Sequence, residues 1–180
     1  DGDWIMDLMD DYKQEPGQKK QIVRRQKNGE FLYRNTLDEP NPKGINNDYC
    51  KFIRLGQNFV ENVEEGVLAY ICGNTFLDTR LFRGMRYELM SKFDEIYIIN
   101  LHGSTKRKES TECSKDECVF NIMVGVSINI FIKHKNADHS KLAKVYYKDI
   151  YGTRREKLDY LSRHQLEDVD FVELSPSAPL

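Results

Sequence analysis

The order of apolar and polar stretches in the middle of the chain predicts a strand, a helix and a second strand. Residues 67–71 are continuously apolar and residues 96–101 are largely apolar, which predicts two buried strands, and residues 78–93 carry apolar side chains at helical spacing. This order is typical of the strand–helix–strand unit of a parallel α/β sheet. The polar pair Asn74 and Thr75 follows the first strand, at the carboxyl end where such sheets bind ligands. The helix, capped by Asp78 or Thr79, is expected to turn these side chains inward: Phe82, Met85, Leu89, Met90 and Phe93.

A further amphipathic helix is predicted before this unit, over residues 48–65. Apolar side chains recur there every three or four residues, Asn47 or Asp48 can cap its start, and Gly66 can end it. The positions expected on its apolar face are Tyr49, Phe52, Ile53, Gly56, Phe59, Val60 and Val63. Residues 3–12 predict another helix, whereas residues 13–47 contain Pro and Gly breakers and little periodicity, which indicates a loop-rich insertion.

The pattern changes after the second strand. A charged loop covers residues 102–117, and two short extended runs follow at 119–123 and 127–133, separated at Gly125. They lie too close together for a helical crossover, so we expect an antiparallel hairpin or a bent strand. The remaining elements are predicted as a strand at 145–150, a helix at 154–163 and a short strand at 171–174. We assign residues 1–150 to one domain and 151–180 to an exit segment with a linker-like Ser/Pro end.

Composition excludes some classes of protein. Hydrophobic residues make up 39% of the 180 residues, enough for a packed core, yet no apolar run of about 18 residues exists to span a membrane. Four scattered cysteines lack the spacing of a zinc site, which favours free thiols in a reducing cytoplasm. The net charge of −2 gives no general signal for nucleic acid, and each cluster of basic residues is more often a solvated face than a phosphate contact. The chain starts with Asp1 rather than Met, so we expect a piece of a longer protein.

The residues taken alone name no reaction. The turn after the first strand supplies only Gly73, so neither a P-loop nor a dinucleotide fingerprint is present, and no nucleophile elbow is found. Asn74 is either a turn residue or part of a ligand crevice. His102 at a strand end is more often a polar loop residue than a catalytic one, and Phe120 is by default a core residue. Asp94 and Glu95 are not followed by the lysine that a nuclease site would need.

Several stretches of the sequence nevertheless resemble one enzyme family. They read GVLAYICGNTFLDTRLFRGMRYEL, FDEIYIINLHGSTKRKE, SKDECVFNIMVGVSINIFIK and NDYCKFIRLGQNFVEN. Together they are similar to the adenine-specific DNA methyltransferase region of type ISP and related helicase-linked single-chain restriction-modification enzymes, from Trp4 to about Leu174. The resemblance implies the second half of a Rossmann-like sheet with parallel strands flanked by helices. Residues 67–71 and 96–101 would be its fifth and sixth strands, and residues 127–133 its last, antiparallel strand.

The reaction implied by the resemblance is methyl transfer from S-adenosylmethionine to the exocyclic amine of adenine in double-stranded DNA. The base must be flipped out of the duplex and stacked in a pocket. Phe120 matches the family's aromatic residue that stacks on the base, an interaction typically worth ~1–3 kcal/mol. Asn74 and Phe76 match positions that line the same pocket. The residues implied to contact the DNA backbone are His102, Lys106, Arg107 and Lys108.

The chain departs from the family by lacking two of its motifs. Both the glycine-rich cofactor motif and the Asn-Pro-Pro-Tyr motif are absent, so we expect no catalytic residue in this chain and no methyl transfer by it alone. The implied partners are DNA and the remainder of a bacterial restriction-modification polypeptide, including a target-recognition domain after the exit segment. A homodimer through an exposed sheet edge is a further expectation. The alternatives are a non-catalytic DNA-binding or scaffold module that retains the fold and, less favoured, a nuclease or helicase accessory segment.

Overall fold

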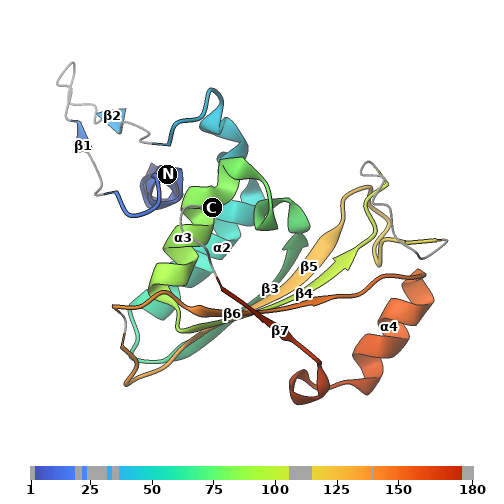
Figure 1. The fold of residues 1–180 in the computed structure, drawn as a ribbon. Helices are drawn as coiled ribbons and strands as arrows, with labels where there is room; N and C mark the ends of the chain where they lie inside the picture. The colour runs from blue at the N-terminus through green and yellow to red at the C-terminus, as the bar shows by residue number, and fades with distance from the viewer. Residues whose placement is uncertain are drawn as a thin grey trace.

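The structure is a computed structural model that describes residues 3–18, 22–23, 32–33, 37–105, 115–138 and 140–175. Helices cover both faces of a five-stranded sheet (Figure 1). Within the described residues the helices are α1 (Asp3–Met9), α2 (Asp48–Glu61), α3 (Arg83–Lys92) and α4 (Arg154–Arg163). The sheet contains β3 (Gly66–Gly73), β4 (Glu95–His102), β5 (Val126–Lys133), β6 (Lys144–Asp149) and β7 (Val172–Leu174). A separate pair is formed by β1 (Ile22–Val23) and β2 (Leu32–Tyr33).

The strand order is β3-β5-β4-β6-β7. β5 is antiparallel to both β3 and β4, so those two strands run in the same direction although they do not touch. β4 and β6 pair in parallel, and β7 closes the edge in the antiparallel sense. The expected α/β class is confirmed, as is the antiparallel strand at 127–133. The expected parallel character holds only in part, because β4–β6 is the one directly hydrogen-bonded parallel pair among the described residues.

Several elements differ from their predicted bounds. The hairpin at Gly125 is wrong, because residues 119–124 form bends and β5 pairs with β3 and β4 instead. α2 is capped by Asn47 as expected, since its Oδ1 accepts a hydrogen bond from Cys50 N at 3.0 Å, but it ends at Glu61 and Gly66 opens β3. α3 begins after two short 3-10 turns, Asn74–Leu77 and Arg80–Phe82, rather than at residue 78 or 79.

The sheet separates two hydrophobic cores. Successive β4 side chains point to opposite faces, so Ile96 and Ile98 pack toward α2 and α3 while Ile99 and Leu101 pack on the α4 side. The inward residues predicted for the α3 region are all buried: Phe82, Met85, Leu89, Met90 and Phe93. Among the described residues no helix combines the length and the apolar character that crossing a membrane requires.

One apolar surface is exposed where burial was predicted. α2 buries Ile53 and Val60, but the other large apolar side chains of the predicted stripe face solvent: Tyr49, Phe52, Phe59 and Val63. Val67 and Ile71 of β3 are also exposed, because β3 is the edge strand and alternate side chains point away from α2. The continuous apolar run at 67–71 therefore does not mark a strand buried on both faces in this structure.

Two buried arginines anchor the amino-terminal part of the chain to the helical layer. Arg54 of α2 donates to Asp11 Oδ2 at 2.7 Å and to Leu8 O at 3.1 Å. Arg83 of α3 forms ion pairs with Glu15 and Glu39. These charged hydrogen bonds leave the segment close to α3, where its backbone approaches Gly84.

We expect Gly84→Ala to destabilise the protein by about 1–3 kcal/mol, as overpacking does. A Cβ at this position would lie 2.7 Å from Tyr12 O and also against Gln14 O, and backbone cannot move aside cheaply. Gly56→Ala in α2 is the matched control, because the atoms nearest to its Cβ belong to the Leu68 side chain, which can rotate away, and not to backbone. Urea unfolding of both variants tests this. Equal destabilisation of the two would contradict the close approach at Gly84.

The pH dependence of stability should distinguish two glutamates. Burial raises the pKa of Glu88, with Asp11 and Glu61 adding to the rise and Lys92 opposing it. The folded state therefore holds this proton more tightly than the unfolded chain, and stability is lost as pH rises from 4.5 through the raised pKa. Glu88→Gln should gain stability relative to the parent over that window, in thermal unfolding measured from pH 4 to 8.

The capping residue Glu156 should have the opposite effect on the pH dependence of stability. Hydrogen bonds from Thr153 lower the pKa of Glu156, so its contribution is present above pH 4.5 and is lost as pH falls. Glu156→Gln should be less stable than the parent at neutral pH, and the difference should shrink on acidification. The same direction for both variants would show that burial of Glu88 does not control its protonation.

Candidate functional site

Polar side chains gather where β3, β4 and β6 end. These strands run in one direction, so their carboxyl ends share an edge of the sheet, and β5 begins at the same edge. Parallel pairing places Asn100 opposite Asp149 and Ile98 opposite Tyr147. The resulting group, called here the carboxyl-end cluster, comprises Asn74, Asn100, His102, Tyr147 and Asp149.

Hydrogen bonds link the carboxyl-end cluster in one chain. Asn74 Nδ2 donates to Asn100 Oδ1 at 3.0 Å, and Asn100 Nδ2 donates to the Tyr147 hydroxyl at 2.8 Å. That hydroxyl in turn donates to Asp149 Oδ1 at 2.6 Å. Burial raises the pKa of Tyr147, and the hydrogen bond to Asp149 raises it further. The phenol therefore stays protonated and fixes the orientation of its neighbours.

His102 closes the chain of hydrogen bonds. Its Nε2 lies 2.6 Å from Asp149 Oδ1, and its ring stacks on Tyr151 with the ring centroids 4.0 Å apart. The register shifts between Asn100 and His102, and His102 has a φ of 48°. A non-glycine residue in this region stores about 1–3 kcal/mol of strain, a feature that clusters at functional sites. The strained turn and the two partners hold the ring in the wall of the site.

Gly125 joins the end of β3 to the end of β4. Its carbonyl accepts a hydrogen bond from Asn74 N at 2.9 Å. A Cβ at Gly125 would lie 2.8 Å from Asn74 Nδ2 and 3.0 Å from His102 O. The position therefore needs the small size of glycine, and it ties the start of β5 to both strand ends.

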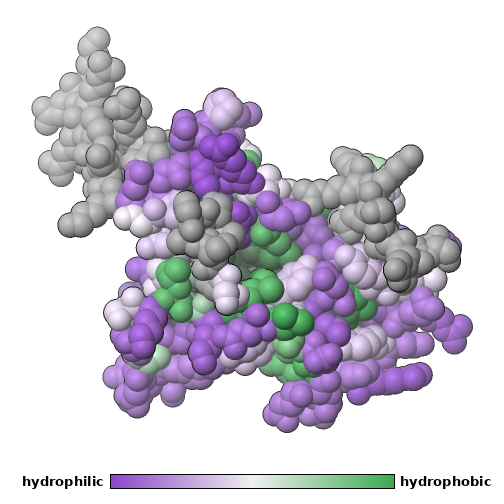
Figure 2. Space-filling view, viewed as in Figure 1, coloured by the Kyte–Doolittle hydropathy of each residue, from purple (hydrophilic) through white to green (hydrophobic). Residues whose placement is uncertain are grey.

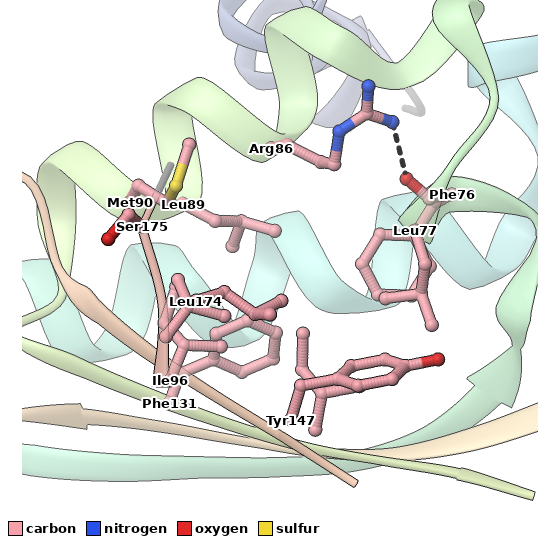
Figure 3. Close-up of a pocket in the computed structure, with 12 residues that line it drawn as sticks. Phe76, Leu77, Arg86, Leu89, Met90, Ile96, Phe131, Tyr147, Leu174 and Ser175 are labelled. Carbon is pink, nitrogen blue, oxygen red and sulfur yellow. Dashed lines mark hydrogen bonds between the residues drawn. The ribbon is translucent and has the colours of Figure 1, made fainter. Parts of the chain in front are cut away.

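An apolar cavity of about 290 Å³ lies beside the cluster, between α3 and the sheet (Figure 3). Phe76 and Leu77 form one wall, Phe131 and Tyr147 lie on the sheet below them, and Arg86 lies above. Arg86 Nη1 donates to Phe76 O at 2.8 Å and so fixes the 3-10 turn. Figure 2 shows apolar residues gathered in the middle of this face within a hydrophilic surround. Leu77 and Tyr147 also line the polar hollow of about 340 Å³ at the cluster.

Phe120 lies in a different part of this edge. Residues 117–124, called here the Phe120 segment, run from the α4 side of the sheet to Gly125. Phe120 is 47% exposed and Met123 is 59% exposed, although the backbone is fixed by bonds such as Thr105 N to Met123 O at 3.3 Å. An open hollow beside the segment is lined in part by Asp116 and Arg154.

The sequence-predicted pocket residues therefore line three hollows. Asn74 belongs to the polar hollow, Phe76 to the apolar cavity and Phe120 to the open hollow on the α4 side. Asn74 and Gly125 are brought together, five residues from Phe120. His102 is 6% exposed and faces Asp149, while its contact with DNA stays a prediction. The same holds for the other predicted backbone contacts, which lie outside the described residues: Lys106, Arg107 and Lys108.

Sequence reasoning missed Asn100, Tyr147 and Asp149. Pairing of the strand predicted at 145–150 in parallel with that at 96–101 would have placed them together, but strand partners could not be read from the pattern. Among the described residues no group of three or more His, Cys, Asp or Glu side chains is arranged to hold a metal. β3 ends at a single glycine, Gly73, and the turn after β6 carries only Gly152, so these strand ends do not fit the glycine-rich cradle of a nucleotide-type cofactor.

Comparison with known proteins gives matches among solved structures. A DrdV–DNA complex determined by cryo-EM is 28% identical over 74% of this chain, with a TM-score of 0.65. A nuclease-deletion mutant of the type ISP restriction-modification enzyme LlaGI, in complex with a DNA substrate mimic, is 25% identical over 78% of the chain, with a TM-score of 0.67. The chain is therefore similar to a part of type ISP restriction-modification enzymes.

The ATP-dependent type ISP enzyme LlaBIII bound to DNA shares the fold, with a TM-score of 0.70 and 24% identity over 78% of the chain. The matched region is a small part of these enzymes, since it covers 13% of the DrdV and LlaGI chains and 9% of LlaBIII. No protein-family model and no curated protein matches the sequence.

Gly125→Ala should displace Asn74 or the end of β4 and cost about 1–3 kcal/mol of stability. Gly73→Ala is the matched control at the same edge, since its Cβ would meet Val124 Cγ1 at 3.4 Å, an ordinary contact, and we expect a change within about 0.5 kcal/mol. Denaturant unfolding gives both values, and the side-chain amide signals of Asn74 in NMR spectra report the displacement. An unmoved Asn74 amide in Gly125→Ala would contradict the packing described here.

Proposed function

We propose that this chain is part of a DNA adenine methyltransferase of a restriction-modification enzyme, which transfers a methyl group from S-adenosylmethionine to the exocyclic amine of a flipped adenine. The observation that carries the proposal is the strand arrangement. β5 is antiparallel and inserted between β3 and β4, which are themselves codirectional and joined through α3. These are the strands that the sequence resemblance assigned to the fifth, sixth and antiparallel last positions of a Rossmann-like methyltransferase sheet.

The comparisons support a DNA-related role for the parent protein. Each of the three solved neighbours is a complex with DNA or a DNA mimic, and LlaGI and LlaBIII are type ISP restriction-modification enzymes. In the proposal, the DNA lies against the carboxyl ends of the strands, where the cluster and the Phe120 segment meet. The sequence places Lys106, Arg107 and Lys108 directly after Thr105, whose backbone N–H donates to Met123 O.

Phe120 is the residue proposed to stack on the flipped base. Its ring is half exposed while its carbonyl accepts a hydrogen bond from Arg154 at 3.1 Å, so the side chain is accessible on a fixed backbone. Asn74 and Phe76 are proposed to shape the neighbouring walls, and the His102–Asp149 pair to hold the end of β4 in place. The transfer step itself is assigned to residues outside this chain, because the described residues offer no cradle for the cofactor.

A second candidate is a non-catalytic DNA-binding or scaffold module. The observation that favours it is the same absence of a glycine-rich turn among the described residues, together with the absence of Asn-Pro-Pro-Tyr from the sequence. The two candidates differ in one measurable property. The parent enzyme transfers labelled methyl groups to adenine, whereas a module binds DNA without any transfer.

The test uses the full-length parent protein with Phe120→Leu and Phe120→Tyr. Leu loses the aromatic ring and Tyr keeps it, so Leu should weaken base binding roughly 5- to 150-fold, the equivalent of ~1–3 kcal/mol, and Tyr should retain it. Methyl transfer and the fluorescence of 2-aminopurine at the target position are the readouts, and thermal unfolding controls for stability. Methylation by Phe120→Leu at the parental rate and affinity would sink the stacking assignment.

A further inference from the structure

A buried lysine of α4 is directed at the end of β4 and at the start of the Phe120 segment. Lys157 is wholly buried, and its Nζ donates to Leu101 O at 2.6 Å and to Glu117 O at 2.7 Å. Asp116 Oδ1 lies 2.6 Å from the same nitrogen. The three protons of the ammonium group are thus matched by three acceptors. One side chain connects the end of β4, the start of the Phe120 segment and α4.

Asp116 extends these connections through backbone amides. Its Oδ2 accepts a hydrogen bond from Gly103 N at 2.6 Å, and its Oδ1 accepts one from Gly152 N at 3.0 Å. Gly103 and Gly152 have φ values of 82° and 130°, a region in which other residues are strained. A Cβ at Gly103 would collide with the backbone of Cys118. The backbone of residues 117–118 therefore packs directly against Gly103, just after the end of β4.

Arg154 holds the next part of the segment from the same side of the helix. It lies three residues before Lys157, so the two side chains share a face of α4. Its Nε donates to Cys118 O at 3.0 Å, and its Nη2 donates to Phe120 O at 3.1 Å and to Asn121 Oδ1 at 2.8 Å. The capping box of Thr153 and Glu156 fixes the start of the helix that carries both residues.

These bonds fix the backbone of the segment and leave its apolar side chains outside. Phe120, Ile122 and Met123 all face solvent. Burying a lysine is costly, and an apolar side chain of similar volume often serves stability equally well. The ammonium group of Lys157 differs from an apolar side chain in one respect: its hydrogen bonds fix the positions of the two carbonyls and the carboxylate that accept them. Such an arrangement prepares a side chain for a ligand by removing the entropy that a mobile loop would lose on binding.

We propose that the first turn of α4, through Lys157 with Asp116 and through Arg154, is the positioning device that presents the ring of Phe120 to an unstacked nucleic-acid base. Lys157 and Arg154 are positioning residues that act through Phe120 and do not touch the base. The inference rests on the proposed function, since it takes Phe120 as the stacking residue. It adds that the stacking geometry is set from the α4 face of the sheet.

The experiment compares Arg154→Met, Lys157→Met and Lys133→Met in the full-length parent protein. Lys133 is the matched control, because its Nζ likewise has three acceptors at the opposite end of the sheet, the backbone carbonyls of Val60, Glu61 and Val63. The readouts are KM and kcat for methyl transfer, 2-aminopurine fluorescence at the target base, and thermal unfolding. Arg154→Met keeps the test decisive if Lys157→Met does not fold.

We expect Arg154→Met to weaken base binding between about tenfold and 10²-fold, as small misplacements of a binding group do, while Lys133→Met lowers thermal stability alone. In a Phe120→Leu background, Arg154→Met should cause no further loss in the base readout, because the effect passes through that ring. Additive losses, or equal base readouts for Arg154→Met and Lys133→Met at matched stability, would overturn the positioning role. If Phe120→Leu itself changes neither readout, the stacking assignment fails instead. If the parent protein transfers no methyl group to adenine, the proposed function fails.

Discussion

The structure depends on β5 lying antiparallel between two strands that run in one direction. Residues Gly66 to Gly73 of β3 pair along one edge of β5, and β4 pairs along the other from Glu95 to His102. β5 also supplies side chains to both cores, since Phe131 packs on Phe93 with ring centroids 5.3 Å apart and Val126 lies on the α4 side. The insertion brings the start of β5 to the carboxyl ends of its neighbours, so Gly125 meets Asn74 and His102. The candidate site is a direct consequence of this pairing.

The periodicity of apolar residues was sufficient to predict the bounds of the elements that bury one continuous face. The strands at 96–101, 127–133 and 145–150 and the helix at 154–163 were found close to their observed bounds, because their patterns agree with their surroundings. The prediction from the α2 stripe was wrong, because the helix turns a neighbouring face inward. That face buries Cys50, Arg54 and Gln57 beside Ile53 and Val60, and the other large apolar side chains of the stripe are exposed. The segment 119–123 misled for another reason. Its composition favours a strand, but the guanidinium of Arg154 donates hydrogen bonds to the carbonyls of Cys118 and Phe120, so these carbonyls bond to a side chain and not to a neighbouring strand.

The site was less predictable than the fold because its residues meet through pairing that the sequence pattern does not encode. Asn74 and His102 could be named from their places at strand ends, and Phe120 from a resemblance. Tyr147 and Asp149 depend on which strand lies beside β4, and strand neighbours are a tertiary property. The role of Lys157 was the least predictable from the sequence. A lysine in a short, polar helix indicates a solvated face, and only the approach of Leu101 O, Glu117 O and Asp116 turns it into a buried anchor.

The two cores divide the candidate site between them. Phe76 belongs to the core under α2 and α3, whereas Cys118 and Val119, which precede Phe120, belong to the core under α4. Asn74 is likewise attached to the first layer by the turn that begins with it, and the Phe120 segment to the second by Arg154 and Lys157. Gly125 is the short connection between the layers. The spacing between Asn74 and Phe120 is therefore determined by how α4 and α3 pack on opposite faces of one sheet. In the proposed function, a change in the packing of α4 would therefore alter the position of Phe120 before that of Asn74.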